Sequence, residues 1–206
     1  MLTRIAVFVS GGGTNLQALI DAQNDGIIKS GEIALVISSN PSAYALVRAA
    51  NADIPYAVVS KKDCADAAQF ETKIIEKLDE YGIDMIVLAG FMSILSEDFT
   101  KKYEKRIINV HPSLIPSFCG KDYYGLRVHE AALARGVKVT GATVHYVNEI
   151  PDGGEIILQK SVKILKTDTA ESLQKRVMKN AEWIILPRAC EMVAAEIRKN
   201  KKEKQQ

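Results

Sequence analysis

Apolar residues gather in short runs along the chain, separated by longer stretches with helical spacing. Residues 5–9 and 85–88 are continuously apolar and too short for helices, so they predict strands buried on both faces. The same alternation predicts strands at 32–38, 56–59 and 107–110, and helices at 16–24, 43–51, 63–81 and 96–103. This order indicates right-handed βαβ crossovers, hence an α/β fold with a Rossmann-like, doubly wound, mostly parallel twisted sheet.

The second half of the chain departs from this alternation. After a helix near 128–135, residues 138–146 and 155–162 predict a strand pair with antiparallel character, joined to the sheet. Asp168 and Glu171 have the spacing of a capping box for a helix from 169, and Pro187 is expected to kink or break that helix.

No linker or repeat interrupts the chain, and the whole of it, 1–206, is expected to form a single domain. The basic residues 197–206 are expected to form a frayed tail.

Composition narrows the class of protein. With 47% hydrophobic and 25% charged residues the chain is typical of globular proteins, and its formal charge of +2 offers no basic stripe for nucleic acid. Three widely spaced cysteines form neither a disulfide framework nor a C-x-x-C site, which suits a reducing cytosol. No apolar stretch reaches the roughly 20 residues of a membrane span, and no signal pattern opens the chain. We expect a cytoplasmic protein that binds neither nucleic acid nor a membrane.

Residues 10–15, Ser-Gly-Gly-Gly-Thr-Asn, separate the first strand from its helix. Glycines let the backbone approach an anion, and the amides at a helix N-terminus supply partial positive charge. The segment lacks the Gly-Lys-Ser/Thr of a Walker A loop, and Leu16 replaces the third glycine of a dinucleotide fingerprint. It predicts a phosphate cradle, the alternative being a tight turn that only caps the helix.

Asn109 and His111 follow an apolar strand and are two residues apart, so on an extended strand end they point to the same side. An amide and an imidazole placed in this way can donate hydrogen bonds to a developing oxyanion. Asp152 lies in a turn beside two glycines and, next to a histidine, becomes a candidate proton acceptor. For each of these residues a purely structural role stays open, and His145 is expected to support the site.

Residues 88–95 run from a strand into an apolar turn, which fits either a pocket for a flat ring system or part of the core.

Two other kinds of chemistry are excluded by the residue patterns. The serines and cysteines lack the contexts of a nucleophile. The three histidines lack the H-E-x-x-H spacing, so no metal site is expected.

Taken together, five segments resemble the phosphoribosylglycinamide formyltransferase family, in that family's order and over nearly the whole chain. They are residues 10–17 (SGGGTNLQ), 87–92 (VLAGFM), 108–114 (INVHPSL), 141–145 (GATVH), and 152–154 (DGG) with 157–159 (ILQ). Several folate formyl-transferring enzymes share the His-Pro-Ser-Leu and Asp-Gly-Gly segments. The glycine-rich start with Asn15 points to the glycinamide ribonucleotide branch.

The resemblance implies a role for each matching position. Asn109, His111 and Asp152 match the family's catalytic trio. Its substrate-phosphate loop and late helix match Gly12, Gly13, Thr14, Asn15, Lys179 and Glu182. Its folate pocket matches Phe91, Met92, Ser93, Ile94, Leu95, Gly141, Ala142 and Thr143. The chain departs from the family at Ser93, where many members carry a basic residue, at Glu155, where proline is frequent, and in a longer stretch at 119–127.

The implied reaction moves the formyl group of 10-formyltetrahydrofolate, the co-substrate, to the amine of 5'-phosphoribosylglycinamide in de novo purine synthesis. It needs no metal. Asn109 and His111 would stabilise the oxyanion, and Asp152 would orient or charge His111 and receive the proton of the amine. The alternatives are a formyltetrahydrofolate deformylase and a non-catalytic nucleotide-binding module. The protein is expected as a monomer or homodimer.

Overall fold

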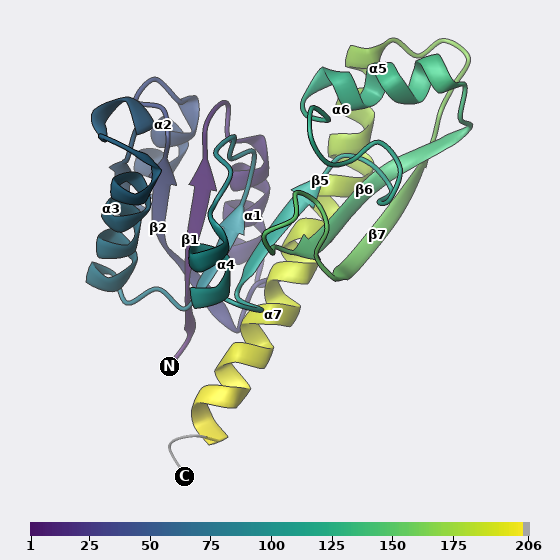
Figure 1. The fold of residues 1–206 in the computed structure, drawn as a ribbon. Helices are drawn as coiled ribbons and strands as arrows, with labels where there is room; N and C mark the ends of the chain where they lie inside the picture. Colours follow the sequence, from purple (N-terminus) through teal and green to yellow (C-terminus); the bar gives the residue numbers. More distant parts are fainter. Residues whose placement is uncertain (204–206) are drawn as a thin grey trace.

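The computed structural model describes residues 1–203, and its seven strands form one mixed sheet (Figure 1). The strands are β1 (Thr3–Val9), β2 (Gly31–Ser38), β3 (Tyr56–Val58), β4 (Met85–Leu88), β5 (Ile107–His111), β6 (Val139–Tyr146) and β7 (Ile156–Lys163). They lie in the order β3-β2-β1-β4-β5-β6-β7. The pairs up to β4–β5 are parallel, whereas β5–β6 and β6–β7 are antiparallel. The predicted fold class is confirmed, with its antiparallel second half.

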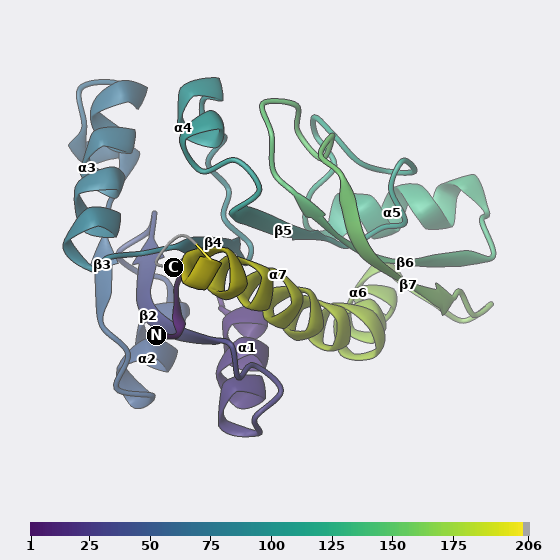
Figure 2. The same cartoon turned by 90° about the horizontal axis from the view of Figure 1, so that it is seen from below.

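Helices cover both faces of the parallel strands. They are α1 (Thr14–Asn24), α2 (Tyr44–Asn51), α3 (Ala67–Glu80), α4 (Glu97–Lys102), α5 (Leu126–Arg135), α6 (Ala170–Val177) and α7 (Trp183–Glu203), with a 3₁₀ turn at Lys61–Asp63 and a π-helical turn at Met178–Glu182. Figure 2 shows α3 and α4 on one side of the strands and α1 and α2 on the other. No helix of residues 1–203 is long and apolar enough to cross a membrane.

The continuous apolar run of β1 follows from this double cover. Successive side chains of a strand point to opposite faces. Ile5, Val7 and Val9 enter the core that includes α1, α2 and α7, whereas Ala6 and Phe8 enter the core that includes α3 and α4. A strand buried on both faces has no position for a polar residue, which is why its sequence does not alternate.

The strand order reverses at β1, since β2 and β3 lie on one side of it and β4 and β5 on the other. In open α/β sheets, ligands bind outside the carboxyl ends of the strands at such a switch point. The loops that leave β1, β4 and β5 all open at this edge, because these strands run parallel. The fold thereby gathers the glycine-rich loop, residues 89–95 and the end of β5.

The starts of α3 and α6 depend on capping residues that the sequence pattern did not identify. The helix expected from 63 begins at Ala67, because the Asp66 side chain accepts a hydrogen bond from the Gln69 amide at 2.8 Å and fixes the start there. The capping box predicted from Asp168 and Glu171 is wrong. Thr169 and Ser172 form it instead, while Asp168 accepts from the Leu165 amide at 2.7 Å.

The C-terminal helix also corrects two expectations. No break occurs at Pro187, because α7 runs through this residue and the irregular π-helical turn at Met178–Glu182 comes before it, and the alternative of a kink stays a prediction. Residues 197–203 are helical rather than frayed, since Ile197 packs against the core and Lys201 forms an ion pair with Asp84. The rest of the expected tail, 204–206, lies outside the described residues.

Candidate active site

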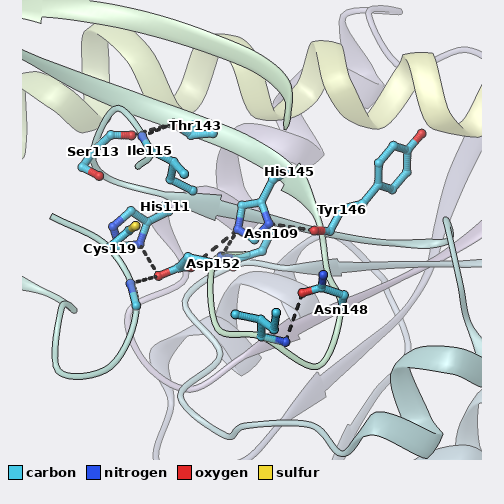
Figure 3. Close-up of polar contacts among 12 residues, drawn as sticks. Asn109, His111, Ser113, Ile115, Cys119, Thr143, His145, Tyr146, Asn148 and Asp152 are labelled. Carbon is cyan, nitrogen blue, oxygen red and sulfur yellow. Dashed lines mark hydrogen bonds and ion pairs between the residues drawn. The ribbon is translucent and has the colours of Figure 1, made fainter. Parts of the chain in front are cut away.

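Asp152 lies between two buried histidines at the carboxyl end of β5 (Figure 3). Its Oδ2 is 3.4 Å from Nδ1 of His111, on β5, and its Oδ1 is 3.5 Å from Nε2 of His145, on β6. The antiparallel register of β5 and β6 sets Asn109 opposite His145, and the Asn109 amide nitrogen is 3.2 Å from His145 Nε2. The catalytic trio expected from the sequence is therefore brought together, with His145 in direct contact with two of its members.

Backbone groups hold the outer sides of this cluster. The other nitrogen of His145, Nδ1, is 2.7 Å from the Tyr146 carbonyl oxygen. The other nitrogen of His111, Nε2, is 2.8 Å from the Phe118 carbonyl oxygen. The Gly120 amide donates to Asp152 Oδ2 at 2.8 Å. The loop after β5 thus fixes both His111 and Asp152 from behind.

The environment sets opposite charge states for the carboxylate and the imidazole. Burial raises the pKa of Asp152, but the contacts with His145 and His111 and the Gly120 amide outweigh it, so that this pKa lies below its ordinary value. Burial lowers the pKa of His111, and the opposing effects of Asp152 and the Phe118 carbonyl do not restore it. At neutral pH the site therefore holds an ionised Asp152 beside a neutral His111.

A cavity of about 150 Å³ opens onto this cluster. Asn109, His145 and Asp152 line it, together with several of the residues expected to bind folate: Phe91, Ser93, Ile94 and Leu95. Loop residues 147–151 complete its wall. The cavity thus joins the apolar turn after β4 to the polar cluster, and the binding of a ring system there stays a prediction.

Four of the expected folate residues do not line this cavity. Met92 is exposed, and its amide donates to Ser10 Oγ at 3.0 Å. Residues 141–143 are buried in β6, where a Cβ on Gly141 would lie 2.1 Å from the Lys160 carbonyl oxygen. The Thr143 hydroxyl donates to the Ser113 carbonyl at 2.7 Å. These contacts hold β7 and the loop after β5 in place, and the folate role of residues 141–143 stays a prediction.

The glycine-rich loop presents unpaired backbone donors. Within the described part of the chain, the N–H groups of residues 11–16 donate no hydrogen bond, whereas the loop carbonyls are used. Arg48 Nε donates to the Gly12 carbonyl at 2.9 Å, and the Ala45 amide donates to the Gly11 carbonyl at 3.1 Å. Gly13 caps α1 with φ +68°, a conformation that favours glycine. The loop is thus anchored by its carbonyls with its amides free.

The late helical segment reaches this loop through one residue. Glu182, in the π-helical turn, is buried and accepts a hydrogen bond from Asn15 Nδ2 at 2.8 Å. Burial raises the pKa of Glu182 to about 7. Lys179, one turn earlier, is exposed. The structure therefore joins Glu182 to the loop, and the role of Lys179 stays a prediction.

Three contributors to the site escape prediction from the sequence. The Phe118 carbonyl and the Gly120 amide are backbone groups, which leave no side-chain signal in a sequence. Arg48 lies on α2, more than 30 residues from the loop carbonyl that it binds, and only its position next to the loop reveals it. Among residues 1–203, no group of three or more His, Cys, Asp and Glu side chains is arranged to hold a metal ion.

Comparison with known proteins decides the family. The formyl transferase family model matches residues 3–190, a range that contains the glycine-rich loop and the whole Asn109–His111–Asp152 cluster. The chain belongs to the formyl transferase family. Its predicted resemblance to the phosphoribosylglycinamide formyltransferases is confirmed by curated relatives and by solved structures.

Relatives of this formyl transferase domain occur as short proteins and within long ones. The chain is 42% identical over 186 residues to phosphoribosylglycinamide formyltransferase of Haemophilus influenzae. This alignment covers 90% of this chain and 84% of the relative. It is 44% identical over 192 residues to the human trifunctional purine biosynthetic protein adenosine-3, covering 93% of this chain. It spans only 18% of that relative's length.

Solved structures agree with this formyl transferase fold. The crystal structure of glycinamide ribonucleotide transformylase 1 from Symbiobacterium toebii matches with a TM-score of 0.88 and 38% identity, covering 95% of this chain and 89% of that one. Phosphoribosylglycinamide formyltransferase from Brucella melitensis matches with a TM-score of 0.86 and 41% identity, over 95% and 97% of the two chains. The likeness thus extends over nearly the complete length of both structures.

Proposed function

We propose that the protein transfers the formyl group of 10-formyltetrahydrofolate to the amine of 5'-phosphoribosylglycinamide, giving formylglycinamide ribonucleotide and tetrahydrofolate. The observation that carries the proposal is the position of two sites at one sheet edge. A loop with free amides follows β1, and a cavity with Asn109 and Asp152 lies at the end of β5, two strands away. Membership of the formyl transferase family and the names of the similar proteins support this choice of substrates.

The chemistry begins when the glycyl amine attacks the formyl carbon. A carbon–nitrogen bond forms and the carbonyl electron pair moves to oxygen, so negative charge develops there. Asn109 lines the cavity and has a second amide hydrogen beyond the one directed at His145, and it would donate to this oxygen. His111 contacts Asp152 directly and does not line the cavity, so it would act on the oxyanion through Asp152.

Asp152 would accept the proton that the attacking amine must lose. Its carboxylate is ionised at neutral pH, lines the cavity, and is held in one orientation by the Gly120 amide. A base fixed in this way contributes about 10²–10⁴ in rate. No covalent enzyme intermediate is required, since the amine of the acceptor is itself the nucleophile.

The glycine-rich loop would bind the phosphate of the ribonucleotide. Its free amides at the start of α1 suit an anion, and Arg48 adds a positive charge beside Gly12. Glu182 would accept hydrogen bonds from the sugar, since it is joined to the loop through Asn15. With the phosphate anchored there, the amine is held toward the cavity, and such positioning can supply about 7–11 kcal/mol of barrier reduction.

The folate would bind with its ring system in the cavity. The apolar turn after β4 supplies Phe91 and Leu95, and the polar cluster lies opposite. We further propose that residues 1–206 form a single cytoplasmic formyltransferase domain, monomeric or homodimeric, without a nucleic-acid or membrane partner.

The phosphate assignment is tested by a pair of glycine substitutions. A Cβ added to Gly12 meets nothing within 4 Å, so Gly12→Val leaves the fold intact while blocking backbone approach to the anion. We expect calorimetric titration to show ribonucleotide binding weakened about tenfold or more, with folate binding unchanged. Equal loss of both affinities in a folded Gly12→Val protein contradicts the assignment.

Gly13→Ala is the contrasting variant. Its Cβ would lie 2.6 Å from the Ala45 Cβ, and the residue has positive φ, so this change is expected to lower stability through the protein's own packing. A thermal melt of both variants therefore separates loss of the ligand site from loss of the fold.

A further inference from the structure

The hydrogen bonds of His145 determine which of its nitrogens carries a proton. A carbonyl oxygen only accepts, so the 2.7 Å contact with the Tyr146 carbonyl requires a hydrogen on His145 Nδ1. The Asn109 amide nitrogen only donates, so the 3.2 Å contact requires a lone pair on His145 Nε2. Both contacts agree on the neutral Nδ1–H tautomer. His145 therefore presents an unprotonated nitrogen to the cavity and to Asp152.

The same reasoning applies to His111 on the opposite side of Asp152. The Phe118 carbonyl accepts from His111 Nε2 at 2.8 Å, so this nitrogen carries the hydrogen. Neutral His111 then directs the lone pair of Nδ1 at Asp152 Oδ2, 3.4 Å away. Phe118 has φ +51°, and the loop holds this strained conformation while it contacts His111.

The central carboxylate is consequently flanked by two lone pairs, with no proton in either gap. Three acceptors that face one another repel, and one added proton turns either contact into a charge-assisted hydrogen bond. Burial raises the pKa of Asp152, whereas His145 and His111 lower it, which is the direction that a proton held between the carboxylate and a ring produces. Burial lowers the pKa of His111. Cys119 also faces the cluster, and burial followed by the charge of Asp152 raises its pKa, so its thiol stays neutral. The cluster is built to hold one more proton.

We infer that His145 acts with Asp152 as the proton-holding pair of the formyl transfer, a role that rests on the proposed function. The attacking amine forms its bond to the formyl carbon and becomes a cationic nitrogen. Its proton passes to Asp152 and on to His145 Nε2, 3.5 Å from the carboxylate. When the intermediate collapses, the carbonyl re-forms and the bond to folate N10 breaks. N10 then takes the stored proton, so the protein ends each turnover in its starting state.

Proton uptake also changes what Asn109 can do. Once Nε2 of His145 is protonated it no longer accepts from the Asn109 amide. That amide hydrogen is released at the moment when the substrate oxygen is negatively charged. Proton transfer and oxyanion stabilisation are thus linked through one side chain, and His145 is a positioning residue for Asn109 as well.

Nitrogen-15 NMR of the imidazole rings tests the starting state without any activity measurement. In the free enzyme at pH 7.5 we expect the Nδ1–H tautomer for His145 and the Nε2–H tautomer for His111. An Nε2–H tautomer or a doubly protonated ring at His145 overturns the inference, whatever the enzyme catalyses.

Kinetics test the role in turnover. His145→Gln keeps an acceptor for Asn109 but holds no proton, and we expect kcat to fall about 100-fold with both KM values within about twofold. His145→Ala leaves room for a small base, so added imidazole is expected to restore part of its kcat. The control is His129→Gln, at the third buried histidine, which lies outside the cluster, and it should retain the parental pH profile.

The outcomes separate the two levels of the proposal. Absence of any ribonucleotide-dependent transfer in the parental protein contradicts the proposed function itself. Normal transfer with parental kcat in His145→Gln, or no imidazole effect on His145→Ala, contradicts only the proton-holding role. Reduced kcat with imidazole rescue supports it.

Discussion

His129 gives the structure a pH dependence that can be worked out from its surroundings. It lies on α5, is fully buried, and neither ring nitrogen has a hydrogen-bond partner within residues 1–203. Burial, and to a smaller extent the charge of His111, lowers the pKa of His129 from 6.5 to about 4. The folded state thus favours the neutral ring, while the unfolded chain binds a proton below pH 6.5.

The sign and size of the effect follow from linkage. The folded-state pKa of His129 is depressed, so above pH 6.5 the ring is neutral in both states and does not change the free energy of unfolding. As the pH falls from 6.5 toward 4, only the unfolded chain binds the proton, and the free energy of unfolding decreases. At pH 4.5 the expected loss is about 2.5 kcal/mol, since each pKa unit corresponds to about 1.4 kcal/mol. That is a large share of the stability of a typical domain, about 5–15 kcal/mol.

Two substitutions remove the titrating imidazole of His129. His129→Leu fills the buried site with an apolar side chain, and His129→Gln keeps a polar one without a titration near neutral pH. Urea unfolding followed by the fluorescence of Trp183, the single tryptophan, gives the free energy of unfolding at each pH. We expect both variants to gain about 2.5 kcal/mol on the parental protein between pH 7.5 and 4.5.

The parental and variant proteins must be compared at the same pH, because Glu182 changes the free energy of unfolding with pH in the opposite direction. Burial raises its pKa to about 7, so its contribution to stability is lost as the pH rises through that value. Glu182 is unchanged in both His129 variants and cancels in the difference. Stability curves of parental and variant proteins that run parallel from pH 7.5 to 4.5 would contradict a depressed pKa of His129 in the folded protein.

Four further substitutions test the site and its support. Asn109→Ala and His111→Ala should each lower kcat far more than ligand binding, and the double variant should lose less than the product of the single losses; near-parental turnover of either variant counts against the oxyanion assignment. Asp152→Asn should bind both ligands in calorimetry yet lose most transfer, and retained transfer excludes it as the proton acceptor. Gly141→Ala should cost about 1–3 kcal/mol or more in urea unfolding, since its Cβ meets the Lys160 carbonyl oxygen, and unchanged stability contradicts this close approach of β6 and β7.

The fold was predictable because each parallel strand carries its own signal. Residues 5–9 and 85–88 are apolar without interruption, and the structure buries them on both faces. Helix boundaries were less predictable where two capping residues compete. Asp168 and Thr169 both fit the N-cap of α6. The Asp168 carboxylate accepts a hydrogen bond from the Leu165 amide instead, so Thr169 becomes the N-cap. Pro187 lies inside α7 and is buried there, a position that the local rule against proline in a helix does not anticipate.

The part of the site that lies on a single strand was predictable from residue spacing. Asn109 and His111 share a face of β5, and the two-residue spacing shows this directly. The contact of His145 with both Asn109 and Asp152 depends on the antiparallel register of β5 and β6, which no local pattern specifies. The Phe118 carbonyl, which fixes the tautomer of His111, is a backbone group and leaves no trace in the sequence.

In the proposed reaction the formyl group passes to an anchored amine rather than to water. The direct measurement follows tetrahydrofolate and formate separately from 10-formyltetrahydrofolate, with and without 5'-phosphoribosylglycinamide. We expect tetrahydrofolate to appear only when the ribonucleotide is present, and the formyl group to be recovered on its amine, because free water lacks the phosphate anchor. Rapid formate release that is unchanged by the ribonucleotide contradicts transfer to the amine and indicates a deformylase.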